Sequence, residues 1–153
     1  MPYSTAAPSF VQPKIPNALI QTLDVMADSF RLPRNRVARV IVGTTLADAS
    51  ARDAIVAEIG KQRENRLNGN TSTVIVWMDH TTSMVFADLM AFTGARASEV
   101  ARAIVTLGCA RGLARFSNAL IAESLRSQSV SDRQIEKIRV QAARRGFDLM
   151  ERA

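Results

Sequence analysis

The side chains that could do chemistry in this sequence are mostly arginines. Seventeen of the 20 basic residues are arginine, and the planar guanidinium suits bidentate contacts with phosphates and base edges. The densest group is Arg31, Arg34, Arg36 and Arg39, four like charges within nine residues. Such a group is ordinarily an exposed helix face, but like charges this close repel unless an anion relieves them. The spacing therefore indicates an anion-binding surface in the first half of the chain.

Residues that could support catalysis are few. The one histidine, His80, follows Asp79, but neighbouring residues of a strand point to opposite faces, and Thr81 and Thr82 indicate that a helix starts here. We therefore interpret His80 as a capping residue. Cys109 is the single cysteine and lies in an apolar helical run, so no internal disulfide or cysteine metal site can form. The sequence predicts no enzyme, no metal site and no cofactor.

The net charge of +6 is unevenly distributed along the 153 residues. Residues 1–50 carry +2, residues 51–70 carry +1, residues 71–112 carry 0 and residues 113–153 carry +3. No apolar segment approaches the roughly 20 residues that a membrane helix needs, and no basic start followed by an apolar run suggests a signal peptide. Together with the lone cysteine this predicts a cytoplasmic protein that does not contact a membrane.

An internal repeat organises the chain. Arg36–Val42 reads RVARVIV, and Glu99–Val105, sixty-three residues later, reads EVARAIV. The same offset also aligns Leu23 with Phe86, Met26 with Leu89 and Asn35 with Ser98. A repeat at a fixed spacing indicates one supersecondary unit used twice.

Each copy has the same pattern of periods. Residues 10–15 alternate like a strand with unlike faces, and the spacing changes after Pro16 to that of an amphipathic helix ending near Phe30. Asn35 is expected to cap a second helix that fades near Ala49. The second copy predicts a strand over 73–79, a helix over 82–93 ended by Gly94, and a helix capped by Ser98.

The remaining segments define the domain organisation. We expect a flexible arm at 1–9, a first unit at 10–49, a solvated helical connector at 50–70, a second unit at 71–112 and a helical extension at 113–153. Met84, Val85 and Phe92 lie off the repeated apolar stripe, so something must cover them. Leu113, Phe116 and Leu120 are expected to do so, and after Gln128 a new helix is announced by the capping box Ser131 to Gln134.

A short strand followed by two helices cannot bury its apolar surfaces alone. The two strands are therefore expected to pair antiparallel, with Gln12 opposite Ile75 and the four helices packed behind. The fold class predicted is mainly α with a two-stranded antiparallel ribbon. Such a ribbon has the size to enter a DNA major groove.

This arrangement resembles the ribbon-helix-helix family, the fold of the Arc and MetJ repressors. The resemblance rests on the polar/apolar strand, the Ile15-Pro16 junction and the helix starts at 35–39 and 98–102, and it covers about half the chain. It implies base contacts on the outward strand face, by Gln12, Lys14, Thr73, Ile75 and Trp77. It also implies phosphate contacts near the second helix of each unit, by Arg34, Asn35, Arg36, Arg96 and Ser98. Ile75 and Trp77 depart from the usual polar readers.

The tandem form resembles the TraY-type relaxosome accessory proteins of conjugative plasmids. The resemblance implies a sequence-specific protein that binds double-stranded DNA, and an autoregulatory repressor is the alternative. From a different class, the chain could be a protein-interaction module that kept the fold without DNA binding, as the apolar second strand favours. Besides double-stranded DNA, the expected partners are a relaxase or another copy of the chain, bound through the C-terminal helices.

Overall fold

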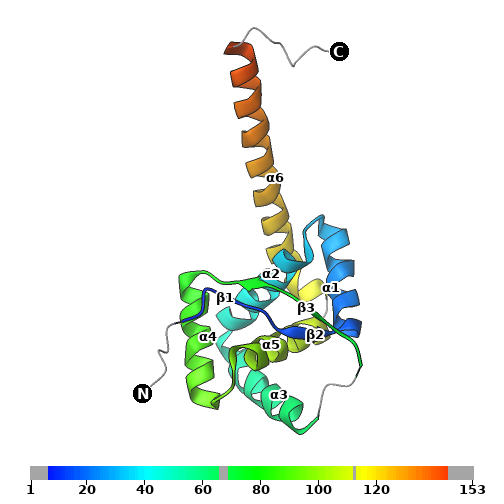
Figure 1. Ribbon diagram of the computed structural model, residues 1–153, viewed down its shortest axis with the longest axis vertical. Helices are drawn as coiled ribbons and strands as arrows, with labels where there is room; N and C mark the ends of the chain where they lie inside the picture. Colours follow the sequence, from blue (N-terminus) through cyan, green and yellow to red (C-terminus); the bar gives the residue numbers. More distant parts are fainter. Residues whose placement is uncertain (1–6, 66–68, 112, 145–153) are drawn as a thin grey trace.

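The computed structural model describes residues 7–65, 69–111 and 113–144 of the chain. The predicted arm at 1–9 lies outside this range for its first six residues, as does the end of the extension from residue 145. The chain is mainly helical and carries a small antiparallel ribbon of two strands (Figure 1). In chain order the elements are β1 (Phe10–Val11), β2 (Lys14–Pro16), α1 (Asn17–Phe30), α2 (Arg34–Ala47), a 3-10 turn η1 (Ala49–Ala51), α3 (Arg52–Glu64), β3 (Thr71–Thr73), β4 (Val76–Trp77), α4 (His80–Thr93), α5 (Ala97–Arg111) and α6 (Leu113–Arg144).

The ribbon keeps one antiparallel register along its length. The partners are Phe10 with Trp77, Val11 with Val76, Lys14 with Thr73, Ile15 with Ser72 and Pro16 with Thr71. The pairing is interrupted near Pro13, which has no N–H to donate, although its carbonyl accepts the Val74 N–H at 3.1 Å. The shared register puts Gln12 opposite Ile75, which is the pairing that the repeat predicts.

The two faces of the ribbon differ as the alternation predicts. The inward side chains are buried against the helices: Val11, Pro13, Ile15, Val74 and Val76. The outward side chains are exposed or half-buried: Phe10, Gln12, Lys14, Thr73, Ile75 and Trp77. Because the inward set holds every apolar β-branched residue except Ile75, a register slip of one residue would exchange the buried and exposed sets. The core thus fixes which side chains a ligand can meet.

The helices repeat at the offset seen in the sequence. α1 and α4 begin sixty-three residues apart and end sixty-three residues apart, and α2 and α5 begin at the same offset. The residues that end α1 and α4 are also equivalent: Arg31 has φ 54° and Gly94 has φ 69°. Gly94 therefore ends its helix as predicted, in the left-handed conformation that glycine adopts without strain.

The start of α4 differs from the prediction in its cap and in its position, since the helix begins at His80, two residues before the predicted start at Thr82. Asp79, rather than His80, is the cap, because its carboxylate accepts the Thr82 N–H at 2.7 Å. The backbone N–H of Thr82, and after it the Thr82 side chain, lower the pKa of Asp79 by hydrogen bonding to its carboxylate. His80 is the first residue of the helix itself.

The predicted solvated connector is wrong for α3. Ile55 and Ile59 are buried, and the helix packs along α5. The thin apolar stripe is enough because only one face of a short helix needs to meet its neighbour. One face of α3, with Ile55 and Ile59, is therefore part of the core.

The extension forms one helix rather than two. α6 runs from Leu113 to Arg144 without the expected break after Gln128, and Figure 1 shows its second half projecting beyond the other helices. No glycine or proline occurs between these residues, so nothing in the backbone interrupts the helix. Position 131 therefore lies within the helix and not at the start of a new one.

The expected cover over α4 is also wrong. Phe116 and Leu120 are buried, but α6 packs on α1, α2 and α5, so they serve the core at the α2–α5 crossing. Met84, Val85 and Phe92 stay exposed, by 54%, 36% and 65%. Arg52 lies over the Phe92 ring, 4.8 Å from its centroid, and pairs with Asp88.

Candidate nucleic-acid interface

The outward face of the ribbon changes character along its length. Lys14 lies opposite Thr73 at one end, and both side chains are exposed. Gln12 occupies the centre across from Ile75, which is half-buried. All the residues predicted to read bases, including Trp77, therefore share one face. Its polar end offers an ammonium and a hydroxyl, which can bond to acceptors on base edges.

The other end of this face is aromatic. Phe10 and Trp77 are register partners, and their ring centroids are 4.9 Å apart with the planes tilted by 39°. The two residues remain 43% and 54% exposed. Phe10 was not among the predicted site residues, although the strand alternation had put it on the outward side. Its role depends on Trp77, sixty-seven residues away, so only the register brings it into the site.

A hollow of about 380 Å³ borders the aromatic end. Trp77 and Arg39 line one side of it, and Glu123 and Arg126 of α6 line the other. Asp79 also reaches it. Most of the other lining residues have small side chains, and the full set is Val40, Gly43, Thr44, Ala47, Met78, Thr81, Thr82, Ala119 and Ala122. Two guanidiniums and two carboxylates meet here, so this hollow has no excess of positive charge.

A second hollow, of about 560 Å³, borders the polar end of the ribbon. It is lined by Ile59, Gln62, Arg63, Arg96, Ser98, Glu99 and Arg102. Arg102 also donates its Nε to the carbonyl of Lys14 at 3.0 Å, which ties this hollow to the ribbon. Three arginines face one carboxylate, so the hollow can accept an anion.

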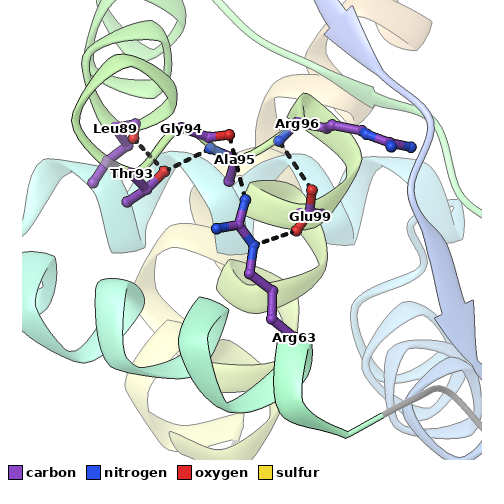
Figure 2. A network of polar contacts seen from close by, with 7 residues as sticks. All are labelled: Arg63, Leu89, Thr93, Gly94, Ala95, Arg96 and Glu99. Carbon is purple, nitrogen blue, oxygen red and sulfur yellow. Dashed lines mark hydrogen bonds and ion pairs between the residues drawn. The ribbon is translucent and has the colours of Figure 1, made fainter.

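Glu99 organises the second hollow (Figure 2). Its carboxylate accepts from Arg63 Nε at 2.8 Å and from the Arg96 N–H at 3.2 Å, and Arg63 also reaches the Gly94 carbonyl. The Arg63 hydrogen bond is the main reason that the pKa of Glu99 is lowered. In Figure 2 the Arg96 side chain points away from Glu99. Arg63 is thus occupied, whereas the Arg96 guanidinium extends to the side.

The caps predicted for α2 and α5 are not formed by Asn35 and Ser98. α2 begins at Arg34 after Pro33, and Asn35 instead accepts the Ile75 N–H at 3.2 Å on its Oδ1. Ile75 sits at a position where the antiparallel ladder leaves this N–H unpaired, so Asn35 satisfies the ribbon edge. α5 begins at Ala97, and Glu99 rather than Ser98 reaches back to the Arg96 N–H.

Two arginines of the cluster in the first half, Arg34 and Arg36, have partners within the chain. Arg34 makes a bidentate pair with Asp24, at 2.8 Å and 2.9 Å. That hydrogen bond lowers the pKa of Asp24. Arg36 contacts Ser127 and lies 3.7 Å from Glu123. At these two positions carboxylates of the chain therefore relieve the repulsion that suggested an outside anion, and the sequence could not predict the Arg36 contact because Glu123 lies far along the chain.

Two residues of the site, Arg39 and Arg102, were not among the predicted DNA contacts, although Arg39 belongs to the arginine group of the first half. Each lines one hollow, and they are sixty-three residues apart. They occupy the same place in the repeated RVAR and EVAR segments, so the repeat itself contained the signal. A comparison of the charged residues at equivalent positions of the two copies, in addition to the helix starts, identifies both arginines.

No protein-family model, no curated protein and no solved structure matches this chain. Among the described residues, no helix is both long enough and apolar enough to cross a lipid bilayer. The geometry and charge of the ribbon face and its two hollows are therefore the features that indicate a function.

Proposed function

We propose that the chain is a sequence-specific protein that binds double-stranded DNA through its ribbon. In this proposal the two halves are ribbon-helix-helix units joined in one chain, and the ribbon enters the major groove with Gln12, Lys14 and Thr73 toward the base edges. The observation that carries the proposal is the outward ribbon face, polar at one end and flanked by Arg39 and Arg102. In this proposal the side chains of the ribbon face distinguish the base sequence, and the flanking arginines fix the position of the protein on the DNA by contacting phosphates.

The phosphate contacts in this proposal belong to the hollows. The hollow with Arg96, Ser98 and Arg102 has the larger excess of positive charge, and it adjoins the start of α5, where backbone N–H groups favour an anion. On the other side Arg34 and Arg36 keep exposed guanidiniums, with 38% and 47% of the side chain accessible. Each has N–H donors beyond those its partner uses.

The test is selection of bound duplexes from a random library, followed by binding measurements at two salt concentrations. We expect an enriched sequence whose affinity exceeds that for random duplex by roughly 10³-fold or more. Lys14→Ala and Gln12→Ala should each lower this discrimination by about 1–3 kcal/mol. Lys61→Ala, which removes the same charge from an exposed position of α3, is the matched control and should leave it unchanged. Absence of any enrichment would refute the proposal.

The biological setting has two candidates that share this activity. A relaxosome accessory factor in conjugative transfer would bind a transfer origin, and an autoregulatory repressor would bind its own promoter. The enriched sequence distinguishes them by where it occurs. A relaxase or another copy of the chain would then bind through α6, whose second half projects from the body.

A protein-interaction module is the second candidate, and the exposed apolar residues of α4 favour it. Met84, Val85 and Phe92 stand where the first half has Gln21, Thr22 and Ser29. An apolar patch on one half only suits a protein partner. If all duplexes tested bound with the same affinity, and Lys14→Ala left that affinity unchanged, this candidate would be supported over sequence-specific DNA binding.

A further inference from the structure

The pair formed by Phe10 and Trp77 is apolar surface at one end of a face that is otherwise polar. The two rings pack against each other, and each residue still exposes about half of its surface. Keeping two large aromatic side chains in water has no advantage for the folded chain alone, because burying them would stabilise it. An exposed, preformed pair of this kind is typical of a contact surface.

The surroundings of the pair favour a DNA occupant. Lys14 shares the same outward face, and Arg39 and Arg126 stand beside Trp77 in the bordering hollow. The two carboxylates of this hollow match its two guanidiniums, since Glu123 pairs with Arg126 at 3.0 Å and Asp79 caps α4 near Arg39. The excess of cations lies on the ribbon face itself, at Lys14, and in the hollow at its polar end, where three arginines face Glu99, and this excess suits a polyanion.

The major groove offers an aromatic pair only one apolar group. Thymine carries a methyl at C5, whereas the other bases present donors and acceptors. The polar end, with Lys14 and Thr73, suits those donors and acceptors instead. The two ends of the ribbon therefore match two different kinds of base edge.

We infer that Phe10 and Trp77 form a thymine-selective contact, so that the ribbon reads an asymmetric site with thymine methyl groups at one end and polar base edges at the other. The inference rests on the proposed function and names the part of the DNA that this end of the ribbon recognises. A pseudo-symmetric ribbon with unlike ends can bind in a single orientation, because reversal would place the aromatic pair against polar edges. The direction of the bound chain on DNA is then set by these two residues.

The test uses the enriched duplex from the selection above, with each thymine replaced singly by uracil, which removes only the methyl group. We expect the affinity to fall about fourfold at thymines of one end, equivalent to ~0.8 kcal/mol for one buried carbon group. Thymines at the other end should tolerate the change.

Two variants assign the effect to the pair. Phe10→Ala/Trp77→Ala should bind the thymine and uracil duplexes equally, whereas Lys14→Ala should keep the full difference. Thermal unfolding of the double variant shows whether it folds; if it does not, the uracil scan on the unaltered protein still decides the question.

The outcomes separate this inference from the proposed function. An enriched sequence that is insensitive to uracil at every thymine overturns the inference and leaves DNA binding intact. A uracil effect that persists in the folded double variant overturns the assignment to Phe10 and Trp77. No enriched sequence at all removes both the function and the inference.

Discussion

Replacing Gly108 by alanine should destabilise the chain, because α5 has no room for a side chain where it crosses α2. A Cβ at this position would overlap Cγ2 of Ile41, and Phe116 Cζ at 3.5 Å closes the space behind it. Ile41 and Phe116 are buried, at 0% and 1% exposure. Ile41 is β-branched and within a helix, so its χ1 rotamer cannot change easily. The two helices must then move apart.

The size of the effect follows from two opposing contributions. Overpacking a dense core costs about 1–3 kcal/mol, and replacing glycine by alanine within a helix returns up to about 1 kcal/mol. We expect a net loss of about 1–2 kcal/mol in the free energy of unfolding, which for a chain of this length lowers the Tm by roughly 2–8 °C.

Gly60→Ala is the matched control for Gly108→Ala. Gly60 lies in α3 with no atom within 4 Å of an added Cβ, so only the helix gain applies and the Tm should rise slightly. Calorimetry or urea titration of both variants gives the comparison. A Gly108→Ala protein as stable as Gly60→Ala would refute the close crossing of α2 and α5, on which the position of the ribbon depends.

Four further predictions concern the ribbon, Cys109, the arginines and the helix ends. Cysteines at Gln12 and Ile75, in a Cys109→Ser background, should form a disulfide within one chain, because opposed residues of this kind have Cα atoms roughly 4.5–5.5 Å apart; purely intermolecular products on a non-reducing gel would contradict the register. Cys109 itself should react slowly with alkylating reagents at pH 7.5, since burial raises the pKa of its thiol to about 11. Arg34→Ala should reduce the slope of log affinity against log salt concentration by up to about one unit. If its slope equalled that of Lys61→Ala, Arg34 would pair with Asp24 without contacting phosphate. Arg31→Gly should stabilise the chain and Gly94→Ala should destabilise it, each by about 1 kcal/mol in urea titration, because both positions have left-handed backbones; the opposite signs would show that the side chain rather than φ decides.

The sequence by itself determined the elements and the faces of the ribbon. The alternation in residues 10–15 assigned Gln12 and Lys14 to the outward side, and the offset between Arg36–Val42 and Glu99–Val105 led to Gln12 opposite Ile75. These inferences succeed because side-chain direction in a strand or helix follows from its period alone, and a repeat adds a second, independent reading of the same period.

Only the tertiary structure decided which partner each polar or aromatic side chain meets. Arg34 of α2 pairs with Asp24 of α1, Asn35 accepts the Ile75 N–H, Arg36 contacts the distant α6, and the Phe10 ring packs at a tilt against Trp77. The unbroken course of α6 and its place against α1 and α2 were likewise not foreseen. Such contacts join residues far apart in the chain, and a solvated arginine differs from a paired one by little free energy. Their outcome therefore depends on how the helices pack, and local sequence does not encode that packing.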